Sequence, residues 1–216
     1  MPITVLLVDD EQLVRAGLRV ILEAQPDIEV VGEAADGAAV VPLTRRLRPD
    51  VVVMDVRMPL LDGIEATRAV LAQVPEPPKI LVITTFENDD YVYEALRAGA
   101  DGFLLKRARP AEIAHAVRLV ATGDSLLFPA AVRSLAAGRG NAAARAVMER
   151  AALTGREEQV LRLMARGLSN AEMAKELLLG TETVKTHVSA VLGKLGARDR
   201  TQAVIAAYES GFVTPG

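Results

Sequence analysis

The chain has 216 residues, half of them hydrophobic and a quarter charged, with a net charge of −3 and no cysteine. This is an ordinary composition for one large or two modest globular domains, and it excludes disulfides and thiolate metal sites. The two histidines, His115 and His187, are too few for a histidine-rich metal site.

The charge is unevenly distributed. Residues 1–121 carry 13 Lys/Arg against 19 Asp/Glu, whereas residues 151–216 carry 8 against 7. An acidic front part and a near-neutral back part indicate two different tasks, although the back part is not basic enough to indicate nucleic-acid binding by charge alone. No stretch approaches the roughly 18 apolar residues of a membrane span, and no signal peptide is recognisable. We therefore expect a cytoplasmic protein without a membrane partner.

Residues 1–121 alternate between short β-branched runs and longer amphipathic stretches. The runs predict strands at 3–8, 28–32, 51–54, 79–83 and 102–105. The stretches predict helices at 11–24, 36–47, 63–73, 88–98 and 110–121. Five apolar strands separated by helices predict an α/β fold, doubly wound around a five-stranded parallel sheet. Pro42 lies inside the second helical pattern, so we expect it to kink or shorten that helix.

The pattern changes after residue 121. Residues 122–150 are interrupted by proline and glycine, and we interpret them as a partly helical linker. Residues 151–216 are purely helical in pattern, with capping-box sequences that begin at Thr154 and Ser169 and a similar one at Asp199. They predict a small all-α domain with helices at about 155–166, 170–177, 182–195 and 200–211, the middle two forming a helix-turn-helix.

Polar side chains collect where the predicted strands end. The first strand is followed by Asp9 and Asp10, the third by Asp55, the fourth by Thr84 and the fifth by Lys106. The carboxyl ends of parallel strands form the ligand-binding edge of such a sheet. Clustered carboxylates favour a hard divalent cation such as Mg²⁺, and a carboxylate is a competent nucleophile toward phosphorus. Each residue taken singly is equally compatible with an ordinary cap or loop position, but their joint placement favours a phosphoryl-transfer site.

The third helix of the second domain carries a candidate DNA-reading face. Its start is rich in small and basic residues, which suit the major groove, and Lys185, Thr186 and Ser189 remain exposed when the apolar face packs inward. The nearby cations Lys194, Arg198 and Arg200 are candidates for phosphate contacts. Spacing alone also fits the solvated polar face of a small helical bundle.

Residues 1–121 resemble a two-component receiver domain with a flavodoxin-like fold. The resemblance rests on Val8–Glu11, Met54–Pro59, Ile83–Thr85 and Gly99–Lys106. It implies that Asp55 accepts a phosphoryl group from a sensor histidine kinase. It also implies that Mg²⁺ (or Mn²⁺) is held by Asp9, Asp10, Asp55 and the Arg57 carbonyl, that Lys106 holds a phosphoryl oxygen, and that Thr84 and Phe103 form a switch pair.

Residues 151–216 resemble a LuxR-type module through Leu153–Glu157, Gly167–Ala174, Thr183–His187 and Lys194–Ala197. The whole chain is thus similar to NarL/FixJ-family response regulators. This implies a transcription factor that forms a homodimer when phosphorylated and binds a duplex DNA operator, with His187 next to the DNA. RNA polymerase is a further candidate partner, and no independent metabolic activity is expected.

Four positions depart from the family pattern. Leu60 and Gly180 replace a frequent glycine and serine, Arg107 replaces a frequent proline, and Pro42 is the fourth. None removes a pocket group. Arg57 and Phe86 lie near the expected path of water, which leaves the lifetime of the acyl phosphate open.

Three alternatives remain open at this point. A phosphohydrolase that uses Asp55 as nucleophile would need an acid two residues later, where Arg57 stands. Single-strand or RNA binding would need aromatic platforms, yet residues 151–216 contain only Tyr208 and Phe212. Control of DNA binding without phosphorylation is disfavoured by the complete acidic pocket.

Overall fold

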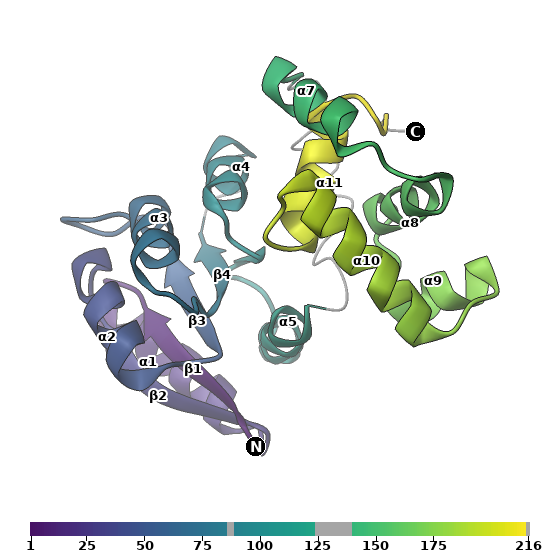
Figure 1. Ribbon diagram of the computed structural model, residues 1–216. Coiled ribbons are helices and arrows are strands. Elements are labelled where there is room, and N and C mark those ends of the chain that lie inside the picture. Colours follow the sequence, from purple (N-terminus) through teal and green to yellow (C-terminus); the bar gives the residue numbers. More distant parts are fainter. Residues whose placement is uncertain (86–88, 124–139, 215–216) are drawn as a thin grey trace. The chain divides into compact units, whose positions relative to one another are not determined.

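The structure is a computed structural model that describes residues 1–85, 89–123 and 140–214 (Figure 1). The chain divides into two compact units, Met1–Thr122 and Gly123–Gly216. Within the described ranges, every helix is too short or too polar to cross a membrane.

The first unit is built on a parallel five-stranded sheet in the order β2-β1-β3-β4-β5. All residues of β3 are buried, as expected for a central strand covered on both faces. The predicted doubly wound sheet is therefore confirmed, with strands β1 (Ile3–Val8), β2 (Ile28–Ala34), β3 (Val51–Asp55), β4 (Lys79–Thr84) and β5 (Gly102–Leu105).

The helices of this unit form two sets. In one set α1 packs against α5, and in the other α3 packs between α2 and α4. Right-handed crossovers in this strand order place the two sets on opposite faces of the sheet (Figure 1). The helices are α1 (Gln12–Glu23), α2 (Val40–Leu47), α3 (Gly63–Gln73), α4 (Asp89–Ala98) and α5 (Pro110–Thr122).

The second helix is shorter than its sequence pattern, as predicted, because it begins only at Val40 and so keeps Pro42 within its first turn. A 3₁₀ turn, η1 (Gly37–Ala39), precedes α2, and Pro42 is the third residue of α2. The first four N–H groups of a helix have no partner within it, so a proline there breaks no helical hydrogen bond. Asp36 caps the 3₁₀ turn by accepting the backbone N–H groups of Ala38 and Ala39.

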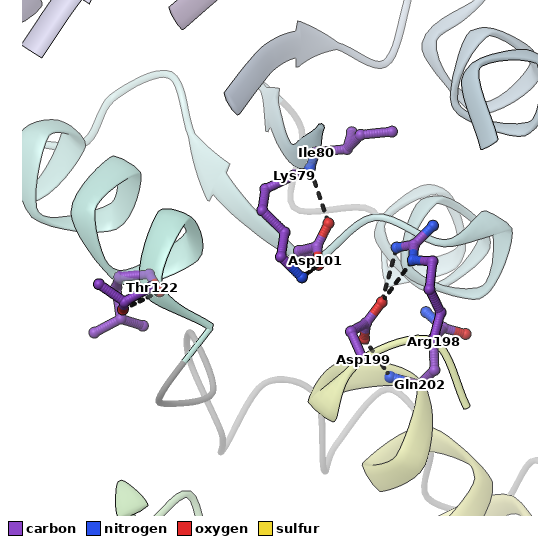
Figure 2. Close-up of polar contacts among 8 residues, drawn as sticks. Lys79, Ile80, Asp101, Thr122, Arg198, Asp199 and Gln202 are labelled. Carbon is purple, nitrogen blue, oxygen red and sulfur yellow. Dashed lines mark hydrogen bonds and ion pairs between the residues drawn. The ribbon is translucent and has the colours of Figure 1, made fainter. Parts of the chain in front are cut away.

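The amino ends of β4 and β5 are joined by one buried carboxylate. Asp101 accepts a hydrogen bond from the Lys79 ammonium at 2.8 Å and another from the Ile80 backbone N–H at 2.9 Å (Figure 2). The Asp101 side chain is almost fully buried, so these bonds satisfy a charge that would otherwise be costly. This contact lies at the edge of the sheet opposite the predicted acidic pocket.

The second unit is helical throughout its described part. Both predicted capping boxes are present, at Thr154 with Glu157 and at Ser169 with Glu172. Asp199 caps the last helix through the Gln202 N–H (Figure 2). The helices are α7 (Ala142–Ala151), α8 (Gly155–Ala165), α9 (Asn170–Leu177), α10 (Thr181–Leu195) and α11 (Arg200–Glu209).

The end of the predicted linker belongs to this helical unit. Helix α7 contacts α10 and α11. Asn141, its N-cap, donates to the Glu209 carbonyl from its backbone N–H at 2.9 Å and to the Glu209 carboxylate from its side chain at 3.0 Å. The expected linker, residues 122–150, was predicted to be partly helical, and its residues 142–150 lie in α7, which packs against α10 and α11. Most of the predicted linker, residues 124–139, lies outside the described residues.

Candidate functional site: an acidic pocket and a recognition helix

Three carboxylates meet at the carboxyl edge of the sheet. Asp9 and Asp10 follow β1 directly, and Asp55 is the last residue of the neighbouring β3. One carboxylate oxygen from each of the three lies within 4.8 Å of the others. Asp9 and Asp55 are buried, whereas Asp10 is exposed. The sequence prediction of an acidic cluster at this edge agrees with this geometry.

Lys106 supplies the positive charge inside the cluster. It follows β5, and its ammonium lies 2.7 Å from an Asp9 oxygen and 2.9 Å from an Asp55 oxygen. Glu11 is a third, more exposed partner at 3.3 Å. Only 8% of the Lys106 side chain is exposed, so its charge is held close to the carboxylates with little solvent between them.

Burial and ion pairing act against each other in this pocket. Burial raises the pKa of Asp55, and the hydrogen bond from Lys106 opposes that rise without cancelling it. Burial acts to lower the pKa of Lys106, but its hydrogen bonds to Asp9 and Asp55 outweigh burial and raise it. Lys106 is therefore a permanent cation at neutral pH. Asp55 pays a desolvation penalty in its charged form, as is common for functional carboxylates.

The donor set fits a hard divalent cation. Three carboxylate oxygens close together repel one another, and Lys106 balances only part of their charge. Mg²⁺ prefers oxygen ligands and keeps several waters, which suits an edge where Asp10 is open to solvent. The pocket is therefore able to hold such an ion beside Asp55.

The two predicted switch residues lie on adjacent strands. Thr84 ends β4 and is buried, and Phe103 lies in β5 with only 9% of its surface exposed. The Thr84 carbonyl accepts the Lys106 backbone N–H at 2.7 Å, which ties the end of β4 to the pocket lysine. Phe103 is thus already buried in this structure.

Arg57 turns its side chain toward α4. Its guanidinium lies 5.1 Å from the centre of the Tyr91 ring, a cation–π distance. Its backbone carbonyl follows Asp55 by two residues, which is the position expected of a metal-ligating carbonyl. Phe86, the other residue expected near the path of water, lies outside the described residues.

Gly63 lets α3 begin in close contact with the backbone of Asp55, a role that the sequence alone did not indicate. It begins α3 beside the end of β3, and a Cβ atom there would lie 2.0 Å from the Asp55 carbonyl oxygen. Its N–H donates to the Val56 carbonyl at 2.9 Å. No residue with a side chain fits this close approach of helix to strand. The signal available in the sequence was the Asp-Gly pair, with Asp62 as helix N-cap.

The second unit presents the start of α10 to solvent. Lys185, Thr186 and Ser189 are exposed, while His187 is half-buried. The opposite face of α10 enters the core through Val184, Val191 and Leu195. The helical period therefore separates a polar face from a packing face, as the sequence predicts.

Two of the exposed polar groups have local partners. The Lys185 ammonium pairs with Glu182 at 2.9 Å, and the Thr186 hydroxyl donates to the Glu182 carbonyl at 3.0 Å. The Lys185–Glu182 pair is solvent-exposed, so it is weak and exchanges readily for another anion.

Two of the predicted phosphate-contacting cations are engaged within the unit. Lys194 pairs with Glu157 of the α8 capping box at 2.7 Å, with about a third of the lysine side chain exposed. Arg198 pairs with Asp199, the N-cap of α11, at 2.8 Å (Figure 2). Both keep part of their surface in solvent.

Arg200 requires a correction. We expected it to contact DNA phosphates, but only 5% of its surface is exposed. Its guanidinium donates to the Leu168 carbonyl and lies 3.4 Å from the Asn170 side-chain oxygen. It therefore binds the turn before α9 to the start of α11, and its position in this structure is not compatible with phosphate contact. Sequence proximity to Arg198 could not reveal this, because Arg198 precedes the N-cap Asp199 and stays partly exposed, whereas Arg200 is the first residue of α11 and is buried.

Comparison with known proteins agrees with this description. Residues 5–118 match the model of the response regulator receiver domain, and residues 151–207 match that of the bacterial regulatory proteins of the luxR family. The chain is 45% identical over 215 residues to the transcriptional regulatory protein LiaR of Bacillus subtilis, covering 98% of this chain and 99% of LiaR. It is 41% identical over 213 residues to the response regulator protein VraR of Staphylococcus aureus, covering 99% and 100%.

Solved structures give the same result. ChrA, a response regulator of a heme-sensing two-component system, is 37% identical with a TM-score of 0.53, covering 98% of this chain and 99% of ChrA. The response regulator RcsB in complex with DNA is 25% identical with a TM-score of 0.56, covering 97% and 99%. With a receiver fold in its first unit and a LuxR-type helix-turn-helix in its second, this chain belongs to the NarL/LuxR family of response regulators.

Proposed function

We propose that the chain is a DNA-binding transcription factor switched on by Mg²⁺-dependent phosphorylation of Asp55 by a sensor histidine kinase. The observation that carries the proposal is the pairing of the Lys106 ammonium with Asp55 at 2.9 Å inside a cluster of three carboxylates. A lysine held there is placed to contact an oxygen of an incoming phosphoryl group, while one Asp55 oxygen acts as nucleophile. Burial of both side chains strengthens these interactions relative to water.

The chemistry requires one bond to form and one to break. An Asp55 oxygen attacks phosphorus, the bond from phosphorus to the kinase histidine nitrogen breaks, and that nitrogen keeps the electron pair and takes up a proton. Lys106 remains charged and holds one phosphoryl oxygen, and the Thr84 hydroxyl is the candidate contact for another. A bound Mg²⁺ would neutralise charge on the transferred group, held by Asp9, Asp10, Asp55 and the Arg57 carbonyl.

Intact-mass spectrometry tests the phosphorylation directly. Incubation with acetyl phosphate and Mg²⁺ should add one phosphoryl mass to the wild type, and EDTA should prevent the addition. Asp55→Asn should remain unmodified, whereas Glu29→Gln, a change at an exposed carboxylate on β2, should be modified like the wild type. A phosphoryl mass that persists in Asp55→Asn would show that another residue is the acceptor.

We further propose that phosphorylation favours a homodimer whose two α10 helices bind half-sites about one helical turn of duplex DNA apart. The exposed Lys185, Thr186 and Ser189 support this role, as does the similarity to a response regulator solved with DNA. The partial exposure of Lys194 and Arg198 suits phosphate contact after exchange of their carboxylate partners. DNA binding in turn implies a cytoplasmic location.

Competition binding distinguishes recognition of duplex DNA from binding of single strands or RNA. A duplex selected from random sequences should displace labelled duplex, whereas single-stranded DNA and RNA should not compete. Lys185→Ala should reduce the slope of log affinity against log salt by about 1, while Arg156→Ala on α8 should leave it unchanged. Equal competition by single strands would favour the alternative of single-strand binding. We propose no metabolic activity beyond phosphorylation and dephosphorylation of Asp55, which turnover assays on phosphate esters would check.

A further inference from the structure

Outside the carboxylate cluster, one arginine of α1 reaches back to the first metal-site residue. Arg15 donates from Nη1 to the Asp9 backbone carbonyl at 2.5 Å. Its Nε donates to Glu33 on β2 at 3.2 Å. The second oxygen of Glu33 is held by Arg19 Nε at 2.6 Å. Arg19, Glu33 and Arg15 thus form a continuous chain of ion pairs and hydrogen bonds that ends at the turn carrying Asp9 and Asp10.

Asp9 is held in this turn through its N–H, its carboxylate and its carbonyl. The Asp9 N–H donates to the Ala34 carbonyl at 3.1 Å, and the Asp9 carboxylate accepts the Glu11 N–H at 2.9 Å. The Asp9 carbonyl lies one residue beyond the end of β1 and accepts the hydrogen bond from Arg15. Only 14% of the Arg15 side chain is exposed. Because Asp10 is the next residue, the same bond fixes the peptide plane from which the exposed Asp10 carboxylate extends.

We propose that Arg15 is a positioning residue for the metal site, and that Glu33 orients Arg15 for this task. Arg15 acts by fixing the backbone of the turn, so that the oxygens of Asp9 and Asp10 stand ready beside Asp55. The inference rests on the proposed Mg²⁺-dependent function and adds to it a residue that touches neither the ion nor the phosphoryl group.

Charge and position make opposite predictions for this arginine. Arg15 is a cation close to a cation site, so its charge alone repels a divalent ion, and its removal would tighten binding. Its hydrogen bond to the Asp9 carbonyl preorganises the ligands, so its removal would weaken binding. Loss of a group that orients metal ligands typically costs 10- to 100-fold in affinity. The sign of the change therefore distinguishes positioning from a bystander charge.

Mn²⁺ titration followed by electron paramagnetic resonance measures this sign on the full chain, without any phosphodonor. Arg15→Met should weaken Mn²⁺ binding by about 10-fold. Arg19→Met is the matched control. Like Arg15→Met, it removes one positive charge and one hydrogen-bond partner of Glu33. Because Arg19 is not the donor to the Asp9 carbonyl, this variant should keep its Mn²⁺ affinity within about 2-fold of the wild type. Arg15→Lys, which keeps one donor for the Asp9 carbonyl, should recover most of the loss.

Failure of the metal site and failure of the positioning role of Arg15 give different results. Asp10→Asn should abolish Mn²⁺ binding; if the wild type binds no Mn²⁺, or binds it equally well in Asp10→Asn, the metal site and the inference both fail. If Asp10→Asn loses binding while Arg15→Met binds Mn²⁺ as tightly as the wild type or more tightly, the metal site stands and the positioning role of Arg15 is overturned. Urea unfolding without metal confirms that each variant is folded under the titration conditions. If Arg15→Met is unfolded there, Glu33→Gln decides instead: it should weaken Mn²⁺ binding clearly more than Glu29→Gln, which removes the same charge from an exposed position of β2, and an equal effect of the two would overturn the positioning role.

Discussion

Leu60 has a strained backbone conformation, and its replacement by glycine is therefore expected to stabilise the protein. Leu60 has a φ of 65°, and the Leu61 N–H donates across it to the Pro59 carbonyl at 2.8 Å. A three-residue turn with positive φ at a leucine is strained. The turn is held in place because the Leu61 carbonyl accepts the Gly37 N–H at 3.2 Å. The strain is therefore imposed by the docking of this loop.

The magnitude follows from three terms. A non-glycine residue in this region of φ costs roughly 1–2 kcal/mol. Replacement by glycine lowers the free energy of unfolding by about 0.4–1 kcal/mol, because glycine gives the unfolded chain more conformational freedom. The Leu60 side chain is 90% exposed, so its removal loses almost no buried apolar surface. Leu60→Gly should therefore stabilise the first unit by about 1 kcal/mol, which is about fivefold in the unfolding equilibrium.

Hydrogen exchange of the β3 peptide measures this in the intact chain, because the fully buried β3 reports global opening of the first unit. Its exchange should slow by about fivefold in Leu60→Gly. Leu13→Gly is the control: Leu13 is 89% exposed but lies inside α1, where glycine should destabilise by about 1 kcal/mol. Faster exchange of β3 in Leu60→Gly than in the wild type would refute the strain argument.

Three further predictions concern the cap of α10, the acidic pocket and the buried arginine. Gly180 caps α10 without a side-chain bond and has room for a Cβ, so Gly180→Ser should stabilise the second unit by about 0.5 kcal/mol in urea unfolding; destabilisation would mean that the serine hydroxyl cannot reach the helix N–H groups. Burial raises the pKa of Asp55, so the protonated Asp55 stabilises the fold below the unfolded pKa near 3.8, and this stabilisation is lost as the pH rises through the folded pKa. Asp55→Asn should therefore unfold at a higher temperature than the wild type at pH 7, and the difference in unfolding temperature should shrink in acid. Arg200→Lys should destabilise the second unit by about 2 kcal/mol while leaving the salt slope of DNA binding unchanged, and a reduced slope in a stable variant would restore Arg200 as a phosphate contact.

Much of the fold was predictable because its signals are local. Strands β1 and β5 begin and end where their apolar runs do, and α3 spans the predicted residues. The capping boxes of α8 and α9 placed those helix starts to the residue, since a cap is a contact over only three positions. The acidic cluster was also predictable, because parallel strands place their carboxyl ends at the same edge of the sheet regardless of the conformation of the connecting loops.

The features that were missed depend on contacts between distant residues. The burial of Arg200 depends on where the turn before α9 packs, and the attachment of α7 depends on the far end of α11. The need for glycine at Gly63 arises from the short distance between α3 and β3, which the local Asp62–Gly63 pair does not reveal by itself. The bond from Arg15 to the Asp9 carbonyl likewise joins a helix face to a loop, and an arginine inside an amphipathic helix carries no signal of its own.

Sedimentation velocity with beryllofluoride, a stable analogue of the phosphoryl group, tests the central claim most directly. With Mg²⁺ and beryllofluoride, the wild type should shift from monomer to dimer, and Asp55→Ala should remain a monomer under the same conditions. The shift should also be absent from the wild type when EDTA replaces Mg²⁺. A dimer that forms equally in Asp55→Ala, or a wild type that stays monomeric while beryllofluoride is bound, would contradict control of assembly by Asp55.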